Sequence, residues 1–266
     1  MKDRLTGWAQ DAADIAMAMI PRRTPDAEAV KRCRIVAHRG AHDYNRAAKE
    51  NTLEAFELAR AAGVWGVETD IRWTADLTPV ICHDPDTARV FGKDARLCDV
   101  SFEELRAAVP AVPSVAEAIA RFGGRLHLML ELKAERFPDI GRQKAILAEH
   151  LAGLAPGADY HMMALDPDLF ETFDIQPRQC CLPVAMTNMA AISRRTLGRP
   201  YGGVTGHYLL LTDAIKRRHE AAGQKVGTGF VKSRNCLYRE INRGMEWIFS
   251  NDAVAIQRML DSVTAL

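Results

Sequence analysis

The chain has 266 residues, of which 48% are hydrophobic and 26% charged, a composition typical of a folded, soluble protein. Its 35 basic and 34 acidic residues give a formal net charge of +1, which excludes the strongly basic surface of a non-specific nucleic-acid binder. We therefore expect a small-molecule partner and no nucleic acid. A length near ~250 residues is common for a single α/β barrel.

The six cysteines show no paired or regular spacing, and a chain of this length does not need disulfides for stability. This pattern indicates a reducing compartment, so we expect a cytoplasmic protein. No stretch approaches the ~20 apolar residues of a transmembrane helix.

Near the start of the chain, Trp8, Ala12, Ile15 and Met19 recur at helical spacing, and Pro21 ends the pattern. The polar face of this helix is poor in Lys and Arg, which favours a helix that closes the bottom of the domain over one that lies on a membrane. We predict that residues 1–33 form an N-terminal helical extension and linker, and that 34–266 form one barrel domain.

The first predicted strand covers 34–40 and ends in the polar residues His38 and Arg39. After a loop, Asn51 and Glu54 have the spacing of a capping box, which predicts a helix that ends at Gly63. The segment Glu50-Asn-Thr52 is interpreted mainly as this helix cap, with Glu50 as a partner of Arg39.

The second predicted strand begins at Gly66 and places Glu68 and Asp70 on one face. A turn centred near Asp76-Leu77 then leads into a returning apolar arm at 80–83. If the two arms pair about that turn, His83 lies opposite Asp70.

Further strands and helices alternate along the rest of the chain. Helices are predicted to begin at Ser101 and Ser114, followed by a strand over 126–133 in which Met129, Glu131 and Lys133 share one face. The remaining predicted strands lie around 160–164, 181–185, 203–208, 225–229 and 245–249, and the helices within 141–154, 168–173, 189–197, 212–222, 236–243 and 253–263. If the arm at 80–83 is a small excursion after strand 2, the strands number about eight and form a TIM (β/α)₈ barrel.

Polar residues at the carboxyl ends of barrel strands form the active site in this architecture. The carboxylates of Glu68, Asp70 and Glu131 could hold one Mg²⁺ or Ca²⁺. His38 and His83 could act as acid and base, while Arg39 and Lys133 could bind an anion. This set suits metal-assisted phosphodiester cleavage. The alternatives are that Lys133 only neutralises Glu131 and that each histidine is structural.

Five short motifs in this order resemble the glycerophosphodiester phosphodiesterase family. They are His38-Arg-Gly40, Glu50-Asn-Thr52, Glu68-Thr-Asp70, His83-Asp84 and Glu131-Leu-Lys133, and the resemblance continues more weakly to Gly244–Asp252. The resemblance implies a phospholipase-C-like TIM-barrel phosphodiesterase that releases a phosphomonoester, such as glycerol 3-phosphate, and an alcohol. It also implies Glu68, Asp70 and Glu131 as metal ligands, His38 and His83 as the acid/base pair, and Arg39 and Lys133 as phosphate contacts.

The chain departs from the family pattern in two places. Its loop at 40–50 is longer than usual, and Val226-Gly-Thr-Gly-Phe230 stands where the family usually has Trp-Thr-Val-Asn. Two other functions therefore stay open. One is a lyase that forms a cyclic phosphate, against which the sequence shows no obvious membrane-docking surface, and the other is a non-catalytic binding module.

Overall fold

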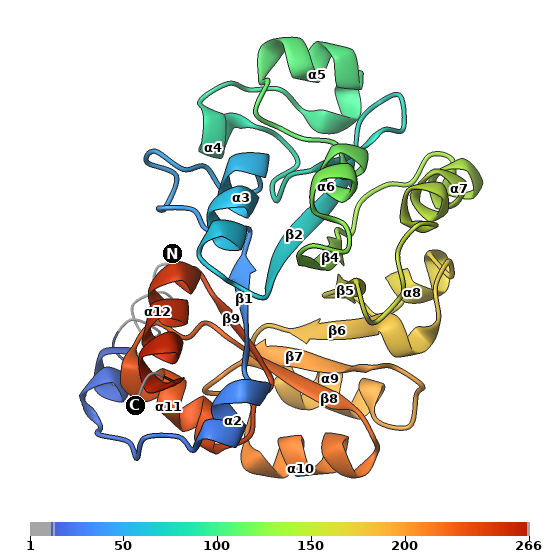
Figure 1. The fold of residues 1–266 in the computed structure, drawn as a ribbon. Coiled ribbons are helices and arrows are strands. Elements are labelled where there is room, and N and C mark those ends of the chain that lie inside the picture. Colours follow the sequence, from blue (N-terminus) through green and yellow to red (C-terminus); the bar gives the residue numbers. More distant parts are fainter. Residues whose placement is uncertain (1–11, 13, 265–266) are drawn as a thin grey trace.

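A computed structural model of the protein describes residue 12 and residues 14–264. Within these residues, eight parallel strands form a closed ring, because β1 pairs with both β2 and β9 (Figure 1). The barrel strands are β1 (Arg34–His38), β2 (Gly66–Trp73), β4 (His127–Leu132), β5 (Tyr160–Ala164), β6 (Cys181–Ala185), β7 (Gly203–His207), β8 (Lys225–Gly229) and β9 (Trp247–Ser250). The predicted TIM barrel is confirmed.

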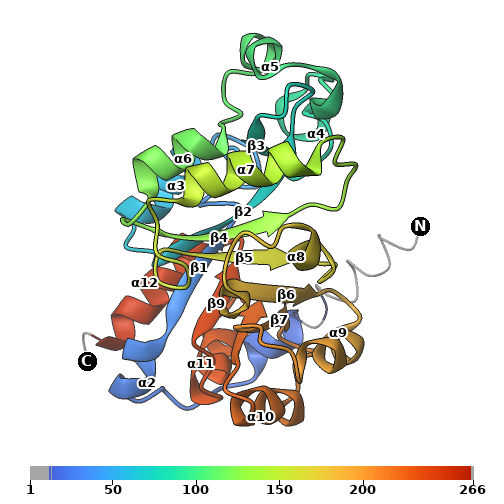
Figure 2. The same ribbon diagram turned by 90° about the vertical axis from the view of Figure 1, so that its right-hand side faces the viewer.

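Helices surround the ring and connect successive strands (Figure 1). They are α3 (Leu53–Ala61), α6 (Val115–Phe122), α7 (Ile140–Leu151), α8 (Leu169–Thr172), α9 (Met189–Thr196), α10 (Asp213–Ala221), α11 (Arg234–Asn242) and α12 (Ala253–Thr264). Since the strands are parallel, their carboxyl ends all meet at one mouth of the barrel, on the right in Figure 2.

The predicted excursion after strand 2 is present as a small lobe at one side of the barrel (Figures 1 and 2). It contains β3 (Pro79–Ile81), α4 (Ala88–Phe91), a 3₁₀ turn at Leu97–Asp99 and α5 (Phe102–Ala108). β3 pairs antiparallel with β2 and adds no strand to the ring. The lobe has its own small apolar cluster, which includes Val80, Leu97 and Leu105.

The register of this hairpin differs from the prediction by one residue. Ile71 pairs with Ile81 and the amide of Cys82 donates to Asp70 O at 3.0 Å, so Cys82, not His83, lies opposite Asp70. The physical reason is the turn, which is centred on Asp76 alone because Leu77 adopts a left-handed conformation with φ of 64°. A leucine rarely adopts this conformation, so the turn type was not visible in the sequence.

The barrel interior follows the alternation predicted for β4. Leu128, Leu130 and Leu132 pack outward against the helices, whereas Met129 packs inside the barrel with Met163, Leu182 and Trp247. Glu131 shares the inward face of Met129, one layer nearer to the carboxyl end of the strand. The same alternation therefore places Met129 in the apolar interior of the barrel and the Glu131 carboxylate nearer to its mouth.

The described part of the N-terminal helix lies at the mouth of the barrel, so its predicted place at the bottom was wrong. Trp8 lies outside the described residues, and 14–19 are helical. The Asp14 carboxylate accepts from Tyr208 Oη at 2.5 Å, after β7, and pairs with Lys232 Nζ at 2.9 Å, after β8. Asn235 Nδ2 also donates to Ala18 O at 2.6 Å. These polar partners hold the helix beside the carboxyl ends of β7 and β8.

A second helix, α2 (Ala27–Arg32), lies between the N-terminal helix and β1, where the sequence predicted a linker. Asp26 caps it by accepting from the amide of Ala29 at 2.7 Å, and the helix packs against α11 and α12. The division into an extension at 1–33 and a barrel at 34–266 remains a proposal. Among the described residues, no helix has both the length and the apolar character needed to cross a membrane.

Candidate active site

Three buried carboxylates meet just inside the mouth of the barrel. Asp70 on β2 stands directly beside Glu131 on β4 in the parallel register, and Glu68 lies two residues earlier on the same face of β2. One oxygen of each of these residues lies within 4.8 Å of the others. The three residues are only 1–7% exposed, so little water is available to screen their mutual repulsion.

Two cations from neighbouring strand ends compensate part of this charge. Lys133 Nζ lies 2.6 Å from Asp70 Oδ1 and 2.5 Å from Glu131 Oε1. The Arg39 amide donates to Glu68 Oε2 at 3.1 Å, and its Nε lies 3.5 Å from Asp70 Oδ2. Arg39 reaches both carboxylates because the chain turns sharply after β1, with φ of 58° at Arg39.

The pKa values show that the compensation is incomplete. Burial and the neighbouring charges of Asp70 and Glu131 raise the pKa of Glu68 well above its usual value. Burial and the charge of Asp70 also raise the pKa of Glu131. Burial alone would raise the pKa of Asp70 as well, but Lys133 and Arg39 outweigh it and hold that pKa low. Additional positive charge would therefore stabilise the cluster.

His38 lies at the end of β1 with its two ring nitrogens directed at different partners. Nδ1 donates to Asn251 Oδ1 at 2.6 Å, and Nε2 lies 3.7 Å from Glu68 Oε2. The ring also packs edge-on against Phe230, with 4.7 Å between centroids. Burial and then the charge of Arg39 lower the pKa of His38 to about 3, so the imidazole is neutral near pH 7.

His83 approaches the same carboxylates from the excursion, in spite of the changed register. Its Nδ1 donates to Asp84 Oδ1 at 2.7 Å. Burial lowers the pKa of His83, and the charge of Asp70 acts in the opposite direction. The ring is therefore close enough for the Asp70 charge to affect its protonation.

Asn51 belongs to this site, although its position was interpreted as a helix cap. Its Nδ2 donates to Asp70 Oδ2 at 2.8 Å, and its Oδ1 accepts from Thr69 Oγ1 at 2.8 Å. Thr52 caps α3 instead, by accepting from the amide of Ala55 at 3.2 Å. An N-cap requires extended backbone, which Thr52 has, whereas Asn51 has φ of 57°. No signal in the sequence separates the two adjacent capping residues.

Glu50 connects the barrel to the excursion. It accepts from Arg39 Nη1 at 2.8 Å, as expected, and also from Arg89 Nη2 at 2.6 Å. Arg89 in turn donates to Asp84 Oδ2 at 2.5 Å, next to His83. The sequence analysis did not identify Arg89, because its contacts depend on how the excursion folds back.

A cavity of about 420 Å³ opens above these residues. The residues that line it come from the loops after β1, β8 and β9 and from the excursion: His38, Arg39, His42, Tyr44, Asn45, Glu50, Arg89, Phe230, Lys232 and Asn251. His42, in the loop after β1, thus lines the cavity. The cavity presents several cations and two aromatic rings to a ligand.

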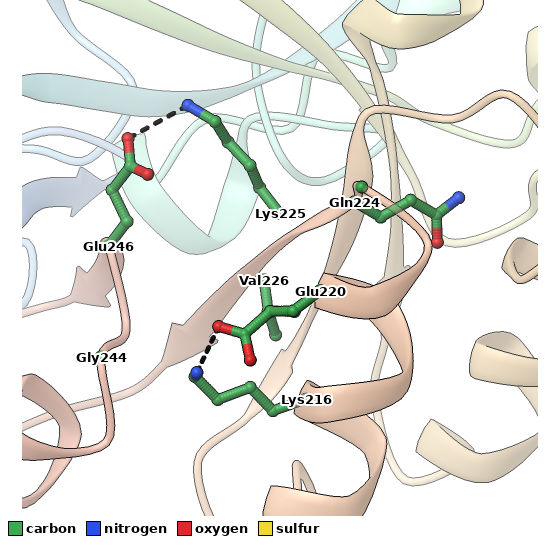
Figure 3. Close-up of a pocket in the computed structure, with 8 residues that line it drawn as sticks. Lys216, Glu220, Gln224, Lys225, Val226, Gly244 and Glu246 are labelled. Atoms are coloured by element: carbon green, nitrogen blue, oxygen red, sulfur yellow. Dashed lines mark hydrogen bonds and ion pairs between the residues drawn. The ribbon is translucent and has the colours of Figure 1, made fainter.

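A second cavity, of about 200 Å³, lies at the opposite end of the barrel (Figure 3). Its charged side chains form two ion pairs, Lys216 with Glu220 and Lys225 with Glu246, the latter at 3.1 Å. The charges that line this cavity are therefore already paired, unlike the crowded carboxylates at the mouth.

The carboxylate cluster fits a hard divalent cation. Its donors are oxygens of three buried carboxylates, the ligand type that Mg²⁺ and Ca²⁺ prefer, and two of them have raised pKa values that a cation would lower. Lys133 Nζ supplies a single positive charge beside two of these carboxylates.

Residues 38–153 match the sequence model of the glycerophosphoryl diester phosphodiesterase family. Over these residues, which are fewer than half of the chain, the protein is similar to the glycerophosphoryl diester phosphodiesterase family. The matched segment includes Glu68, Asp70, Glu131, Lys133 and both candidate histidines.

Curated relatives in the glycerophosphoryl diester phosphodiesterase family support the match. Glycerophosphodiester phosphodiesterase 1 of Bos taurus is 33% identical over 129 residues, which cover 43% of this chain and 38% of the relative. The human protein of the same name is 39% identical over 99 residues, covering 32% of this chain and 29% of the relative. The chain therefore spans well under half the length of the curated relatives that it matches.

Solved structures of family members share the fold over most of the chain. The Thermotoga maritima glycerophosphodiester phosphodiesterase is 20% identical with a TM-score of 0.71, covering 85% of this chain and 98% of its own. An Oleispira antarctica phosphodiesterase, solved in complex with the product sn-glycerol-3-phosphate, is 21% identical with a TM-score of 0.71 and covers 86% and 96%. At this identity the likeness establishes the barrel architecture.

Proposed function

We propose that the protein is a metal-dependent phosphodiesterase that hydrolyses glycerophosphodiesters or a related small phosphodiester to a phosphomonoester and an alcohol. The observation that carries this proposal is the group formed by Glu68, Asp70 and Glu131 with His38, Arg39 and Lys133, in which His38 and Arg39 line an open cavity. Similarity to the family model supports the reaction type, and the product-bound Oleispira antarctica structure supports a glycerol phosphate product.

In this proposal Glu68, Asp70 and Glu131 hold one divalent cation, Mg²⁺ or Ca²⁺. When bound, such an ion would polarise a phosphoryl oxygen of the substrate and stabilise the charge that develops there. Arg39 and Lys133 orient the phosphate by hydrogen bonds and charge. The contacts of both side chains with Asp70, and the place of Arg39 in the cavity lining, support this role.

His38 and His83 act as the acid/base pair in this proposal. His38 is held neutral with its Nε2 free of a proton, because Nδ1 donates to Asn251, so Nε2 can accept a proton from the attacking hydroxyl. In its protonated form, His83 would deliver the Nε2 proton to the leaving alcohol, while its Nδ1 keeps the bond to Asp84 that orients the ring. The His38 ring reaches the carboxylates from β1 and the His83 ring from the excursion.

The test is turnover and metal binding by the purified full-length chain. We expect hydrolysis of glycerophosphodiesters with Mg²⁺ or Ca²⁺, its loss on chelation, and calorimetric binding of one divalent ion. Glu131→Gln should weaken ion binding more than about ten-fold, because one of three charged ligands is lost. Leu58→Ser, a substitution on the outer helix α3, is the control.

Three outcomes would redirect the proposal. A cyclic phosphate detected by phosphorus NMR would indicate the lyase, and ligand binding without turnover would indicate the binding module. No turnover and no ion binding would contradict the proposal as a whole.

We also propose a cytoplasmic location, supported by the six cysteines, all of which are free thiols.

A further inference from the structure

Exposed large hydrophobic side chains gather around the mouth of the barrel. Nine such side chains, 40–76% exposed, occur in the described part of the chain, and eight of them lie on this rim. Tyr44 follows β1, Leu165 follows β5, Met186 follows β6, Leu209 and Leu210 follow β7, and Ile15, Met19 and Ile20 belong to the N-terminal helix and its end. Only Leu58, on α3, lies elsewhere. We call these eight side chains the apolar rim.

The N-terminal helix exposes two of its large apolar side chains. Ile15 and Met19, one turn apart, are 63% and 76% exposed. Met17 of the same helix packs against the barrel core, and the Asp14 carboxylate and the carbonyl of Ala18 bind polar groups of the barrel. Contact with the barrel therefore accounts for Met17 but leaves Ile15 and Met19 uncovered, and an apolar surface could cover them.

The apolar rim surrounds a polar opening. Tyr44 belongs both to the rim and to the lining of the cavity, next to Arg89 and Lys232. A ligand that approaches through this opening therefore meets apolar side chains on the outside and cations inside. This order matches the boundary of a lipid surface, where acyl chains lie behind a layer of charged phosphodiester headgroups.

We propose that the apolar rim docks the mouth of the barrel onto a lipid surface, so that phosphodiester headgroups reach the cavity directly from that surface. The proposal rests on the proposed function for the chemistry of the cavity. It extends the substrate class from small diesters to phosphodiesters that carry an apolar chain. The rim side chains insert among the acyl chains, while Arg39 and Arg89 face the headgroups.

The spacing of the rim favours lipid over a protein partner. Its side chains stand on five separate segments and are interrupted by charged residues such as Asp43 and Asp166. A protein interface needs a contiguous core packed as densely as a protein interior. A fluid lipid boundary instead accepts isolated apolar side chains, because each one inserts independently.

The experiment measures co-sedimentation of the full-length chain with vesicles of phosphatidylcholine and phosphatidylglycerol. We expect binding that falls roughly ten-fold or more in Ile15→Ser/Met19→Ser, and also falls in Met186→Ser, because each change removes an apolar side chain that inserts among the acyl chains. Leu58→Ser is the matched control and should bind as the unchanged protein does. Thermal unfolding of each variant verifies that the barrel is intact.

The outcomes separate this inference from the proposed function. No vesicle binding, equal losses with Leu58→Ser, or a rim-dependent dimer in analytical ultracentrifugation would overturn the docking surface. Turnover of soluble glycerophosphoglycerol should be unchanged in all three variants. If that turnover is absent in the unchanged protein while rim-dependent vesicle binding is present, the proposed function fails and the docking surface stands.

Discussion

At His38, one hydrogen bond determines which ring nitrogen faces the carboxylates. Because Asn251 Oδ1 can only accept, the proton resides on Nδ1 and Nε2 carries the free lone pair toward the site. Asn251 is thus a positioning residue, reached from the loop after β9. Its role is invisible in the sequence, since 213 residues separate the two partners.

We expect Asn251→Leu to lower kcat by between about ten- and one hundred-fold with a smaller change in KM, because the imidazole loses its fixed tautomer. Asn251→Asp keeps an acceptor at the same place and should recover part of the activity. Steady-state kinetics on a soluble glycerophosphodiester measures both effects. A wild-type kcat in Asn251→Leu would show that the bond does not orient His38.

The residue types of the site were predictable, but their partners were only partly so. The alternation in β2 and β4 indicated Glu68, Asp70 and Glu131, because period two fixes which side chains face the barrel. Asn51 was misassigned because two capping residues adjoin, and its left-handed backbone became visible only in the fold. Motif order suggested the pairing of Arg39 with Glu50. The contacts of Arg89 were not predictable, because they depend on how the excursion folds back toward the barrel.

Among the elements, β7 and β8 approach each other more closely than side chains allow. A Cβ placed on Gly203 would lie 2.1 Å from the carbonyl oxygen of Lys225, well inside van der Waals contact. That oxygen belongs to the backbone of the neighbouring strand and cannot move without opening the barrel. Glycine at the start of β7 is therefore required by strand spacing.

We expect Gly203→Ala to lower the free energy of unfolding by about 1–3 kcal/mol or more, since the new methyl overpacks a rigid backbone contact. Urea denaturation measures the change. Gly153→Ala is the control, because a Cβ there meets nothing within 4 Å and the stability should change little. Equal effects from the two substitutions would contradict this account.

The positions of two elements could not be read from periodicity. The pattern at 12–20 predicted a helix but not its partner, and contacts with Tyr208 and Lys232, almost two hundred residues later, place it at the mouth. The hairpin at 66–83 was predicted with its register shifted by one, because Leu77 adopts an unusual backbone conformation. Local patterns predict elements well, whereas distant polar contacts orient them.

For the molecule as a whole, a pair of buried histidines links stability to pH. His161 Nδ1 donates to His127 Nε2 at 2.8 Å, and His127 Nδ1 donates to Ala158 O at 2.9 Å, an arrangement that requires the His127 ring to be neutral. Burial lowers the pKa of His127 to about 4 and that of His161 to about 3. The unfolded chain therefore binds more protons than the folded one between those values and the usual pKa near ~6.5.

Since the unfolded state binds the extra protons, these two histidines make the free energy of unfolding fall as pH decreases from about 6.5 toward 4. The slope is ~1.4 kcal/mol per pH unit for each extra proton that the unfolded state binds. We expect the slope of unfolding free energy against pH to be shallower in His161→Asn than in the unchanged chain. Urea denaturation at pH 7.5, 6 and 5 gives both slopes. His150→Asn, at a histidine on the outer helix α7, should leave the slope unchanged.

The barrel itself was the most predictable feature, because it depends on patterns repeated along the chain. Eight strands could be predicted from three features of the sequence. These are the alternation of apolar and polar residues inside strands, the capping residues before helices, and the regular succession of strands and helices along the chain. The apolar rim was not predictable in this way. Its members are single residues on separate loops, and only the closed ring brings them to one face.

The carboxylate of Glu50 connects the barrel with the excursion, and this connection limits how the two can change in evolution. It serves as the common counter-ion of Arg39, on the barrel, and Arg89, on the excursion, while it is only 5% exposed. A change at position 50 would remove the acceptor that Arg39 and Arg89 share and leave them only their contacts with Asp70 and Asp84. A change at position 89 would alter the charge near Arg39. Homologues that reshape the excursion should therefore change positions 50 and 89 together, so that the lobe and the site diverge as one inherited unit.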